Sequence, residues 1–354
     1  MAYTTVDDGS EYFTTTLYTG NESTNAITNS ANAGDFQPDW VWLKSRNSAT
    51  HHRLYDSSRG ALKNILSSAA NTEATTANSL TSFDSNGFTL GSDDNSNQNT
   101  KTFVAWQWKA NGGTTSSNGD GNITSTVQAN TTAGFSIVLF TGNATAGQTV
   151  GHGLGVKPEI IFAKNRSNGN NWNVYAEPVD NTGNNYLTLN GTVAKESDFN
   201  MWNDTAPTTS LITLGDRNET NGSSHNMVFY CFHSVKGYSK IGSYTGNGNA
   251  DGTFVYTGFK PAWIMLKRTD STNNWNIFDN KRDVDNQVGN VLYANLSNAE
   301  EADASHSSAN DFLSNGFKLR ETGNAVNGSG ATYIYIAFAE HPFVSSKGVP
   351  VTAR

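Results

Sequence analysis

The chain alternates short apolar runs with longer polar stretches, and five of the runs recur three times in the same order. We call each recurring run a box, and each set of five boxes a copy. Runs such as residues 40–43 and 333–338 mix aromatic and β-branched side chains, which suit the pleated surface of a strand. The run 333–338 is apolar throughout, which predicts a central strand buried on both sides.

The five boxes keep their order in every copy. The first reads aromatic-Thr-Gly-Asn, at residues 18–21, 140–143 and 244–247. The second holds a proline, a strand-like run and a lysine, at residues 36–44, 156–164 and 259–267. The third is an aromatic eleven residues after that lysine, namely Tyr55, Tyr175 or Phe278. The fourth spans residues 85–90 and 314–319, with a shortened form at 211–215, and the fifth spans 103–108, 227–232 and 333–338.

The spacing of the copies indicates domain-sized modules. The box prolines Pro38, Pro158 and Pro261 are separated by 120 and 103 residues. A period of this length exceeds that of a solenoid unit and fits a module with its own core. We predict modules at residues 1–110, 133–237 and 238–343, a Gly/Ser/Thr-rich linker at 111–132 and a C-terminal tail at 344–354. The short second connection predicts closely coupled second and third modules, and a freer first module.

Local signals favour strands over helices. The box prolines suit the first position of a strand, and Asn86-Gly87 and Asn315-Gly316 suit tight hairpin turns. Helix-like composition is confined to residues 61–70 and 299–312, which are predicted to form short helices in loops. The fold class predicted is all-β, with three tandem diverged modules that are β-sandwich or jelly-roll-like.

Composition and charge exclude several partners. Of the 354 residues, 11% are aromatic, which is too many for a disordered chain, and the formal net charge is −8 without a Lys/Arg cluster. We therefore expect no nucleic-acid partner. No apolar run approaches the roughly 18 residues needed to span a bilayer, so no membrane insertion is expected. The first residues lack signal-peptide features, which predicts synthesis in a host cytoplasm, and the single Cys231 is predicted to be buried.

Motifs that carry catalytic chemistry are missing from the sequence. The 7 histidines do not recur at one repeat position, and neither HExxH, GxSxG, a P-loop nor a dinucleotide fingerprint occurs. The sequence therefore predicts a protein that is not an enzyme, with no catalytic residues, no metal site and no cofactor.

One repeated charged pair is a candidate for ligand binding. Asp56 and Arg59 in copy one correspond to Asp279 and Arg282 in copy three. These residues suit a site for a glycan or carboxylate, because Asp accepts from hydroxyls and Arg donates in pairs to anions. The alternative, which we favour, is an ion pair that fixes the loop after the third box. Copy two has no charge at either position, so a module can fold without the pair.

The tryptophans offer a second set of candidates. Trp40 and Trp42 share one face of a strand, as do Trp106 and Trp108, and the core is the favoured location for all four. Loop residues are better placed to contact a ligand. The first candidates of this kind are Trp172 and Trp275, each of which follows an asparagine just before the third box.

The sequence resembles a family of virion structural proteins from marine and cyanobacterial phages, often labelled tail-fibre or tail proteins. The stretches that carry the resemblance are residues 1–8, 37–42, 52–60, 242–252 and 336–343. The resemblance implies residence in the virion, other virion proteins as partners and a homotrimer as the favoured assembly. The family's domain has no assigned function, so no catalytic residues carry over.

Four roles are compatible with these observations. The favoured role is a tail appendage, a fibre or spike protein, that contacts a glycan on the host surface. The alternative is a decoration or connector protein of head or tail that binds only virion neighbours. A glycan depolymerase is disfavoured because no acidic pair repeats, and a secreted lectin because signal peptide and disulfides are missing. We also expect one chain end to order only within the assembly.

Overall fold

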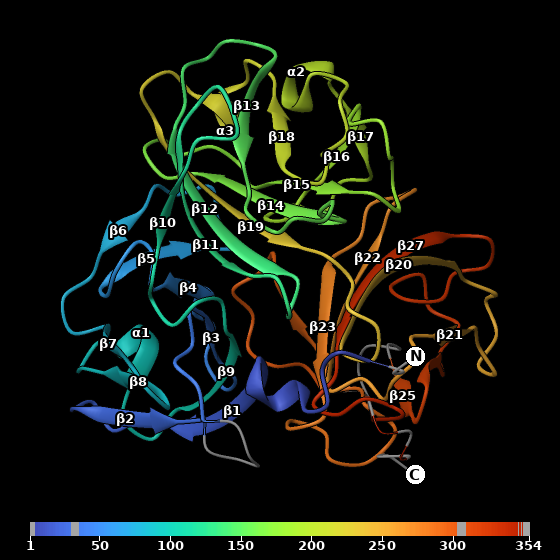
Figure 1. Ribbon diagram of the computed structural model, residues 1–354. Helices are drawn as coiled ribbons and strands as arrows, with labels where there is room; N and C mark the ends of the chain where they lie inside the picture. Colours follow the sequence, from blue (N-terminus) through green and yellow to red (C-terminus); the bar gives the residue numbers. More distant parts are fainter. Residues whose placement is uncertain (1–3, 30–34, 303–308, 346, 348, 350–354) are drawn as a thin grey trace.

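The structure is a computed structural model that describes residues 4–29, 35–302, 309–345, 347 and 349. Figure 1 shows three lobes around a common centre, coloured blue to teal, green to yellow, and orange to red along the chain. Each lobe corresponds to one copy of the repeat. The chain is all-β, with antiparallel sheets and a few helices of a single turn in the described part. In that part, no helix has the length and apolar character needed to cross a membrane.

The secondary structure of module 1 consists of η1 (Gly9–Glu11), β1 (Phe13–Thr19), β2 (Asn25–Thr28), β3 (Trp40–Ser45), β4 (Arg53–Asp56), β5 (Lys63–Leu66), β6 (Ala74–Thr75), β7 (Leu80–Asp84), β8 (Gly87–Leu90), α1 (Asp94–Asn97) and β9 (Thr102–Trp108). Module 2 contains β10 (Ser116–Asn118), β11 (Ser125–Asn130), β12 (Phe135–Thr141), β13 (Gln148–Gly151), β14 (Ile160–Asn165), β15 (Asn173–Ala176), β16 (Asn185–Thr188), β17 (Glu196–Ser197), α2 (Phe199–Trp202), β18 (Leu211–Leu214), α3 (Asn218–Asn221) and β19 (Asn226–Phe232). Module 3 contains β20 (Ser239–Thr245), β21 (Phe254–Tyr256), β22 (Trp263–Arg268), β23 (Trp275–Asp279), β24 (Leu292–Tyr293), β25 (Asn310–Leu313), β26 (Gly316–Leu319) and β27 (Thr332–Phe338).

The main sheet has the same topology in all three modules. The fifth-box strand (β9, β19 or β27) lies between the first-box strand and the second-box strand, and the third-box strand follows. The register is also the same, since Trp108, Phe232 and Phe338 occupy equivalent pairing positions. A smaller sheet packs on one face of each main sheet: β2-β8-β7, β13-β18 or β21-β26-β25. Each module is therefore a two-sheet sandwich.

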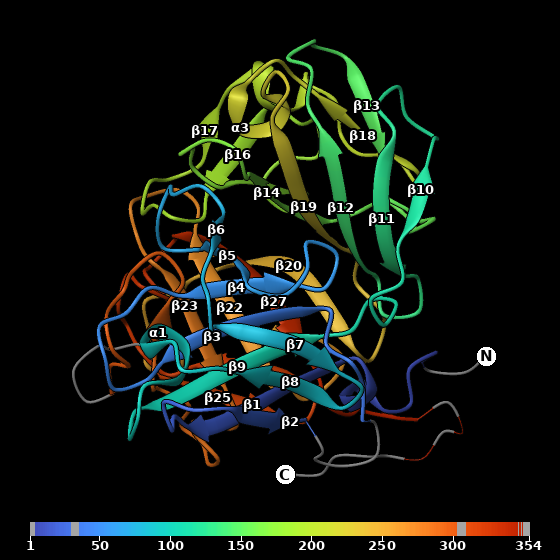
Figure 2. The same cartoon turned by 90° about the vertical axis from the view of Figure 1, so that its left-hand side faces the viewer.

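The opposite face of each main sheet is buried as well. Along β9, Ala105 points into the sandwich core of module 1, whereas Trp106 and Trp108 point into a core shared by all three modules. The same alternation holds along β19 and β27. These strands are apolar on both faces because each face meets a core, which confirms the prediction made for residues 333–338. Figure 2 shows the sheets of module 1 and module 3 stacked across this centre.

The shared core, defined by the buried cluster around Trp40, Trp108 and Phe338, contains seven of the eight tryptophans. Trp40 of module 1 stacks on Tyr230 of module 2, with ring centroids 4.5 Å apart. Trp108 lies edge-on to Trp263 of module 3, at 5.6 Å. The same-face tryptophans of β3 and β9 are thus core residues, as expected. Module 1 is as closely attached as the other two, contrary to the expectation that it would be freer.

An acidic side chain at the start of the second-box strand fixes the chain where it passes to the next module. Asp39 accepts the backbone N–H groups of Ala110, Gly112 and Gly113 at 2.7–2.8 Å. Glu159 accepts the N–H of Ser234 at 2.7 Å in the same way. In the third module this position is Ala262. The acid is present where one module leads directly into the next.

Two segments differ from their predicted conformation. Residues 61–70, predicted as a helix, form a turn and β5, because Leu62 has a left-handed φ of 67° and Lys63–Leu66 pairs with β4. Of the predicted helix 299–312, residues 303–308 lie outside the described part, and β25 begins at Asn310. Weak helix propensity over so few residues does not compete with sheet pairing.

The predicted linker also differs from expectation, and one of the two chain ends is described. Residues 111–132 carry β10 and β11, which extend the main sheet of module 2. The described part of the N-terminal stretch packs on the end of module 2, where Thr4 Oγ1 donates to the Lys236 carbonyl at 2.6 Å, and on module 3, where the N–H of Ser10 donates to the Glu340 carbonyl at 3.0 Å. It is therefore ordered within its own chain. Most of the tail 344–354 lies outside the described residues.

We predict that the modules unfold together. Trp40→Ala is expected to lower the free energy of unfolding by about 3–5 kcal/mol, since it removes a large ring from a packed core. Hydrogen exchange should then accelerate in β9, β19 and β27 alike. Phe88→Ala, in the sandwich core of module 1, is the matched control and should act first on β2, β7 and β8. Unchanged protection in β19 and β27 of Trp40→Ala would contradict a common core.

Candidate functional site

The six residues predicted to bind a ligand are all buried at the contacts between modules. We call these contacts the first joint (modules 1 and 2), the second joint (modules 2 and 3) and the third joint (modules 3 and 1). Trp172 and Trp275 are fully buried, as are Asp56 and Asp279, and the arginines are at most 7% exposed. A ligand in solvent does not reach them, so their predicted role in ligand contact is replaced by a structural one.

The two tryptophans bond neighbouring modules together. Trp172 Nε1 donates to the Leu66 carbonyl of module 1 at 2.7 Å. Trp275 Nε1 donates to the Thr188 carbonyl of module 2 at 3.0 Å. Leu66 and Thr188 hold equivalent positions in β5 and β16.

His52 takes the equivalent position in module 1. Its Nδ1 accepts from Trp42 Nε1 at 2.8 Å, and it lies against the backbone of Tyr293 in module 3, outside hydrogen-bond geometry. Burial lowers the pKa of His52, which favours the neutral ring. Each module thus reaches the preceding one, and the third joint closes the three into a ring.

An ionic network spans the first joint. Arg59 forms an ion pair with Asp56, and Arg59 Nη1 also donates to Glu73 Oε2 at 3.0 Å. From module 2, Arg166 donates to both oxygens of Glu73, at 2.8 and 3.0 Å. Tyr230, also of module 2, donates its hydroxyl to Asp56 Oδ2 at 2.6 Å. The network is therefore an Asp–Arg–Glu–Arg chain shared by two modules.

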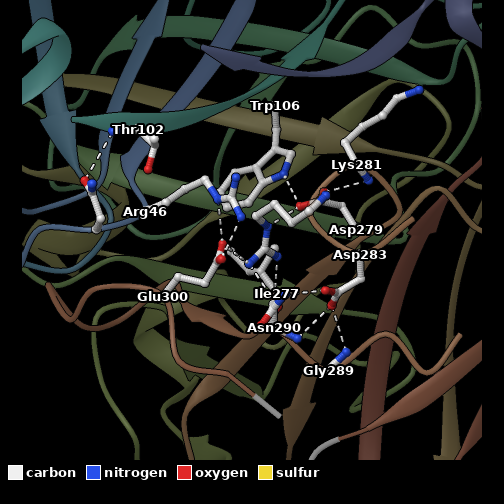
Figure 3. Close-up of polar contacts among 12 residues, drawn as sticks. Arg46, Thr102, Trp106, Ile277, Asp279, Lys281, Asp283, Gly289, Asn290 and Glu300 are labelled. Atoms are coloured by element: carbon white, nitrogen blue, oxygen red, sulfur yellow. Dashed lines mark hydrogen bonds and ion pairs between the residues drawn. The ribbon is translucent and has the colours of Figure 1, made fainter. Parts of the chain in front are cut away.

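The third joint repeats this network with different residues (Figure 3). Arg282 Nε donates to Asp279 at 2.6 Å, and its Nη1 donates to Glu300 at 3.1 Å. Arg46 of module 1 donates to both oxygens of Glu300, at 2.9 and 2.8 Å. Trp106 Nε1 replaces the Tyr230 hydroxyl and donates to Asp279 Oδ2 at 3.0 Å.

Charge compensation makes these buried groups tolerable. Burial alone would lower the pKa of Arg59, but Asp56, Tyr230 and Glu73 outweigh it and raise that pKa. Burial likewise would raise the pKa of Glu73, yet hydrogen bonds and charge from Arg166 and Arg59 bring it below the ordinary value. Every charge has a partner, so the networks fix the relative position of modules and leave no charge for a ligand.

The second joint lacks the network but keeps the backbone contact. At the first joint, the backbone N–H of Glu73 donates to the Arg166 carbonyl at 3.0 Å. At the third joint, the backbone N–H of Glu300 donates to the Arg46 carbonyl at 2.7 Å. At the second joint, the N–H of Lys195 donates to the Thr269 carbonyl at 2.9 Å. The positions of the buried Asp and Arg are taken by Ala176 and Val179. The joint has the same backbone geometry without the buried carboxylates.

A cavity of about 330 Å³ lies at this second joint. Its volume falls in the lower range of small-molecule sites. Both modules line it, with Pro178, Val179, Lys195, Ser243, Tyr244, Thr245, Thr269, Thr332, Tyr333 and Ile334. We take this cavity as the candidate functional site. In the described part of the chain, no group of three or more His, Cys, Asp and Glu side chains is arranged to hold a metal ion.

The lysines of the second box are buried beside the joints. Lys164 Nζ donates to the Ala70 carbonyl of module 1 at 3.1 Å, and Lys267 Nζ to the Thr192 carbonyl of module 2 at 3.0 Å. Lys44 donates to carbonyls of its own module. Burial lowers the pKa of Lys44 to about 7, and those of Lys164 and Lys267 to about 8.

A set of buried asparagines was missed by the sequence analysis. Asn97, Asn221 and Asn327 each accept the N–H of the first-box asparagine and donate to nearby carbonyls. The first-box glycine is needed because a Cβ at Gly20 would lie 2.1 Å from the Gln98 carbonyl oxygen. Each of these asparagines lies six residues before the fifth box, and this constant spacing is the signal that could have revealed them.

The fold and the joints define a class: an all-β ring of three fused sandwich modules. Residues 8–342 match the model of a family described as a domain of unknown function (DUF7483), and the chain belongs to this family. The match covers all three modules, so the family unit is the whole ring. No curated protein and no solved structure matches the chain.

We predict that Glu73 stabilises the first joint in a pH-dependent way. Its pKa in the folded protein lies below the unfolded value of about 4.3, so the stabilisation is present above that pH and is lost as the pH falls through the folded pKa. Glu73→Gln should lower the free energy of unfolding at pH 7 by about 1–3 kcal/mol. Lys195→Gln, at the equivalent position of the second joint, should change it by less than about 0.5 kcal/mol. Denaturant titrations at several pH values measure both, and equal losses would contradict the assignment.

We also predict that stability rises with pH in the alkaline range. Burial lowers the pKa of the three box lysines, so the unfolded chain binds more protons than the folded chain between about pH 7 and 10. The free energy of unfolding should increase by at least about 1 kcal/mol from pH 7 to 9.5. Lys44→Met should reduce this slope, whereas Lys63→Met, at a partly exposed position, should preserve it. A slope that is the same in both variants would exclude Lys44 as its source.

Proposed function

We propose that the chain is a non-enzymatic bacteriophage virion protein, a tail appendage that contacts the host surface. The sequence resemblance at five stretches supports residence in a virion. The observation that carries the proposal is that the buried polar groups bind other modules of the same chain. The two carboxylate–arginine networks and the buried tryptophans hold the ring together. The body is a scaffold for recognition by exposed surface residues, a common division of roles in binding proteins.

Exposed aromatic residues are the contacts we propose for the host surface. In β21 of module 3, Phe254 is 43% and Tyr256 is 59% exposed, and both lie on one face because they are two residues apart. In α2 of module 2, Phe199 is 57% exposed. Exposed aromatic rings suit stacking on sugar rings, and we propose them in place of the buried Trp172 and Trp275 as the ligand contacts.

We propose a homotrimer as the assembly. The inner faces of the three main sheets are occupied by modules of the same chain. A trimer therefore forms through the outer surfaces of the ring, together with other virion proteins.

A second candidate is a decoration or connector protein that binds only virion neighbours. The rounded, three-lobed body in Figure 1 supports this role as much as the first, because such a body fits a lattice position as well as the end of a fibre.

Labelling of intact particles tests the proposal. A gold-labelled antibody against the chain should mark the tail, and purified protein should compete with phage for adsorption to host cells. Phe254→Ser combined with Tyr256→Ser should weaken this competition by about tenfold or more, whereas Val284→Ser, at another exposed position, should leave it unchanged. Label on the head, or no competition at saturating protein, would favour the second candidate. Release of oligosaccharides from host polysaccharide would contradict the non-enzymatic assignment.

A further inference from the structure

The cavity at the second joint is lined by four positions that carry different side chains at the other joints, and three of the four have smaller side chains here. The bridging carboxylate, Glu73 or Glu300, is replaced by Lys195. The arginine that meets it from the next module, Arg166 or Arg46, is replaced by Thr269. A long side chain and its ionic partner are therefore missing from the centre of the joint.

Two further positions, like that of Thr269, have smaller side chains at this joint. The buried arginine, Arg59 or Arg282, is replaced by Val179. On the first-box strand, the leucine at position 17 of β1 and at 139 of β12 is replaced by Ser243 of β20, as the common strand register shows. All four replacements line the cavity. The cavity thus results from the replaced side chains, because the backbone contact at this joint is the same as at the other two.

The electrostatics of the cavity favour an anion. Lys195 has no ion-pair partner in the part of the chain that the structure describes. The neighbouring carboxylates are engaged elsewhere: Glu196 interacts with the hydroxyl of Tyr186, and Asp270 pairs with Arg268 at 2.7 Å. An exposed lysine without a carboxylate partner therefore lies at the position where the other two joints hold a partly buried glutamate.

The remaining lining favours a ligand with hydroxyl groups. The side-chain hydroxyls of Ser243 and Thr245 have no hydrogen-bond partner among the described residues. Val179 and Ile334, which belong to or pack on the shared core, give an apolar wall beside them. A cation, free hydroxyls and an apolar wall are together suited to a sugar that carries a carboxylate.

We propose that this cavity binds an acidic monosaccharide unit, with its carboxylate at Lys195 and its hydroxyls at Ser243 and Thr245. The inference deepens the proposed contact with a host glycan and rests on that proposal for its biological setting. Binding by purified protein and location on the particle are measured independently. The failure of one proposal can therefore be told apart from the failure of the other.

The test is titration of the purified full chain with D-glucuronate, monitored by calorimetry and ligand-observed NMR. Glucuronate should bind at least about tenfold more tightly than methyl glucoside, which lacks the carboxylate, and than acetate, which lacks the hydroxyls. Lys195→Met should weaken glucuronate binding by about tenfold. Lys63→Glu, a charge change in module 1 outside the cavity, should leave it unchanged.

The other joints supply a design that fills the cavity. Lys195→Glu combined with Thr269→Arg recreates the carboxylate–arginine pair, and should abolish binding while the thermal unfolding midpoint is retained or raised. Ser243→Leu, which restores the residue of the other two joints, gives the same test by an uncharged route should the double variant fail to fold. No binding of glucuronate, equal binding of methyl glucoside, or undiminished binding to a folded filled variant would overturn the proposal.

Discussion

One shared hydrophobic core determines most of the architecture. A sandwich module normally buries one face of each sheet and exposes the other, whereas here the main sheets bury both. The outward-facing alternative would expose a row of tryptophans, which is unfavourable in water. The modules therefore associate through these faces, and seven tryptophans are required to fill the space where three sheets meet. Both the aromatic content of the second and fifth boxes and the ring itself follow from this requirement.

The polar groups at the joints serve a different purpose from the core. Apolar packing is non-directional, and three similar faces could associate in several registers. The Trp172 and Trp275 bonds, and the two carboxylate–arginine networks, are satisfied in one arrangement alone. They specify how each module sits on the next. The second joint has no carboxylate–arginine network but retains the backbone hydrogen bond. Its side chains are therefore free to diverge.

Much of the module was predictable from the sequence, whereas the arrangement of modules was not. Recurring boxes predicted the strands, the all-β class and the buried fifth-box strand, because strand patterning is a local property. The same patterning did not reveal that Trp106 faces another module, since a residue in a sandwich core and one between modules are equally apolar. Asp56 and Arg59 were correctly seen as a pair, but Glu73 and Arg166 complete the network from distant parts of the chain. Residues 61–70 were misassigned because a left-handed Leu62 has no sequence signal.

Closure of the ring has a consequence for how such a protein evolves. Arrays of repeats ordinarily lengthen and shorten by tandem duplication, because each unit contacts only its neighbours along a line. Here His52 of module 1 meets the backbone of module 3, so every module already has two neighbours and a fourth would find no free face. Copy number is therefore fixed at three, and change is confined to the individual joints. Divergence at one joint, rather than gain of a module, is the route to new binding specificity that this architecture leaves open.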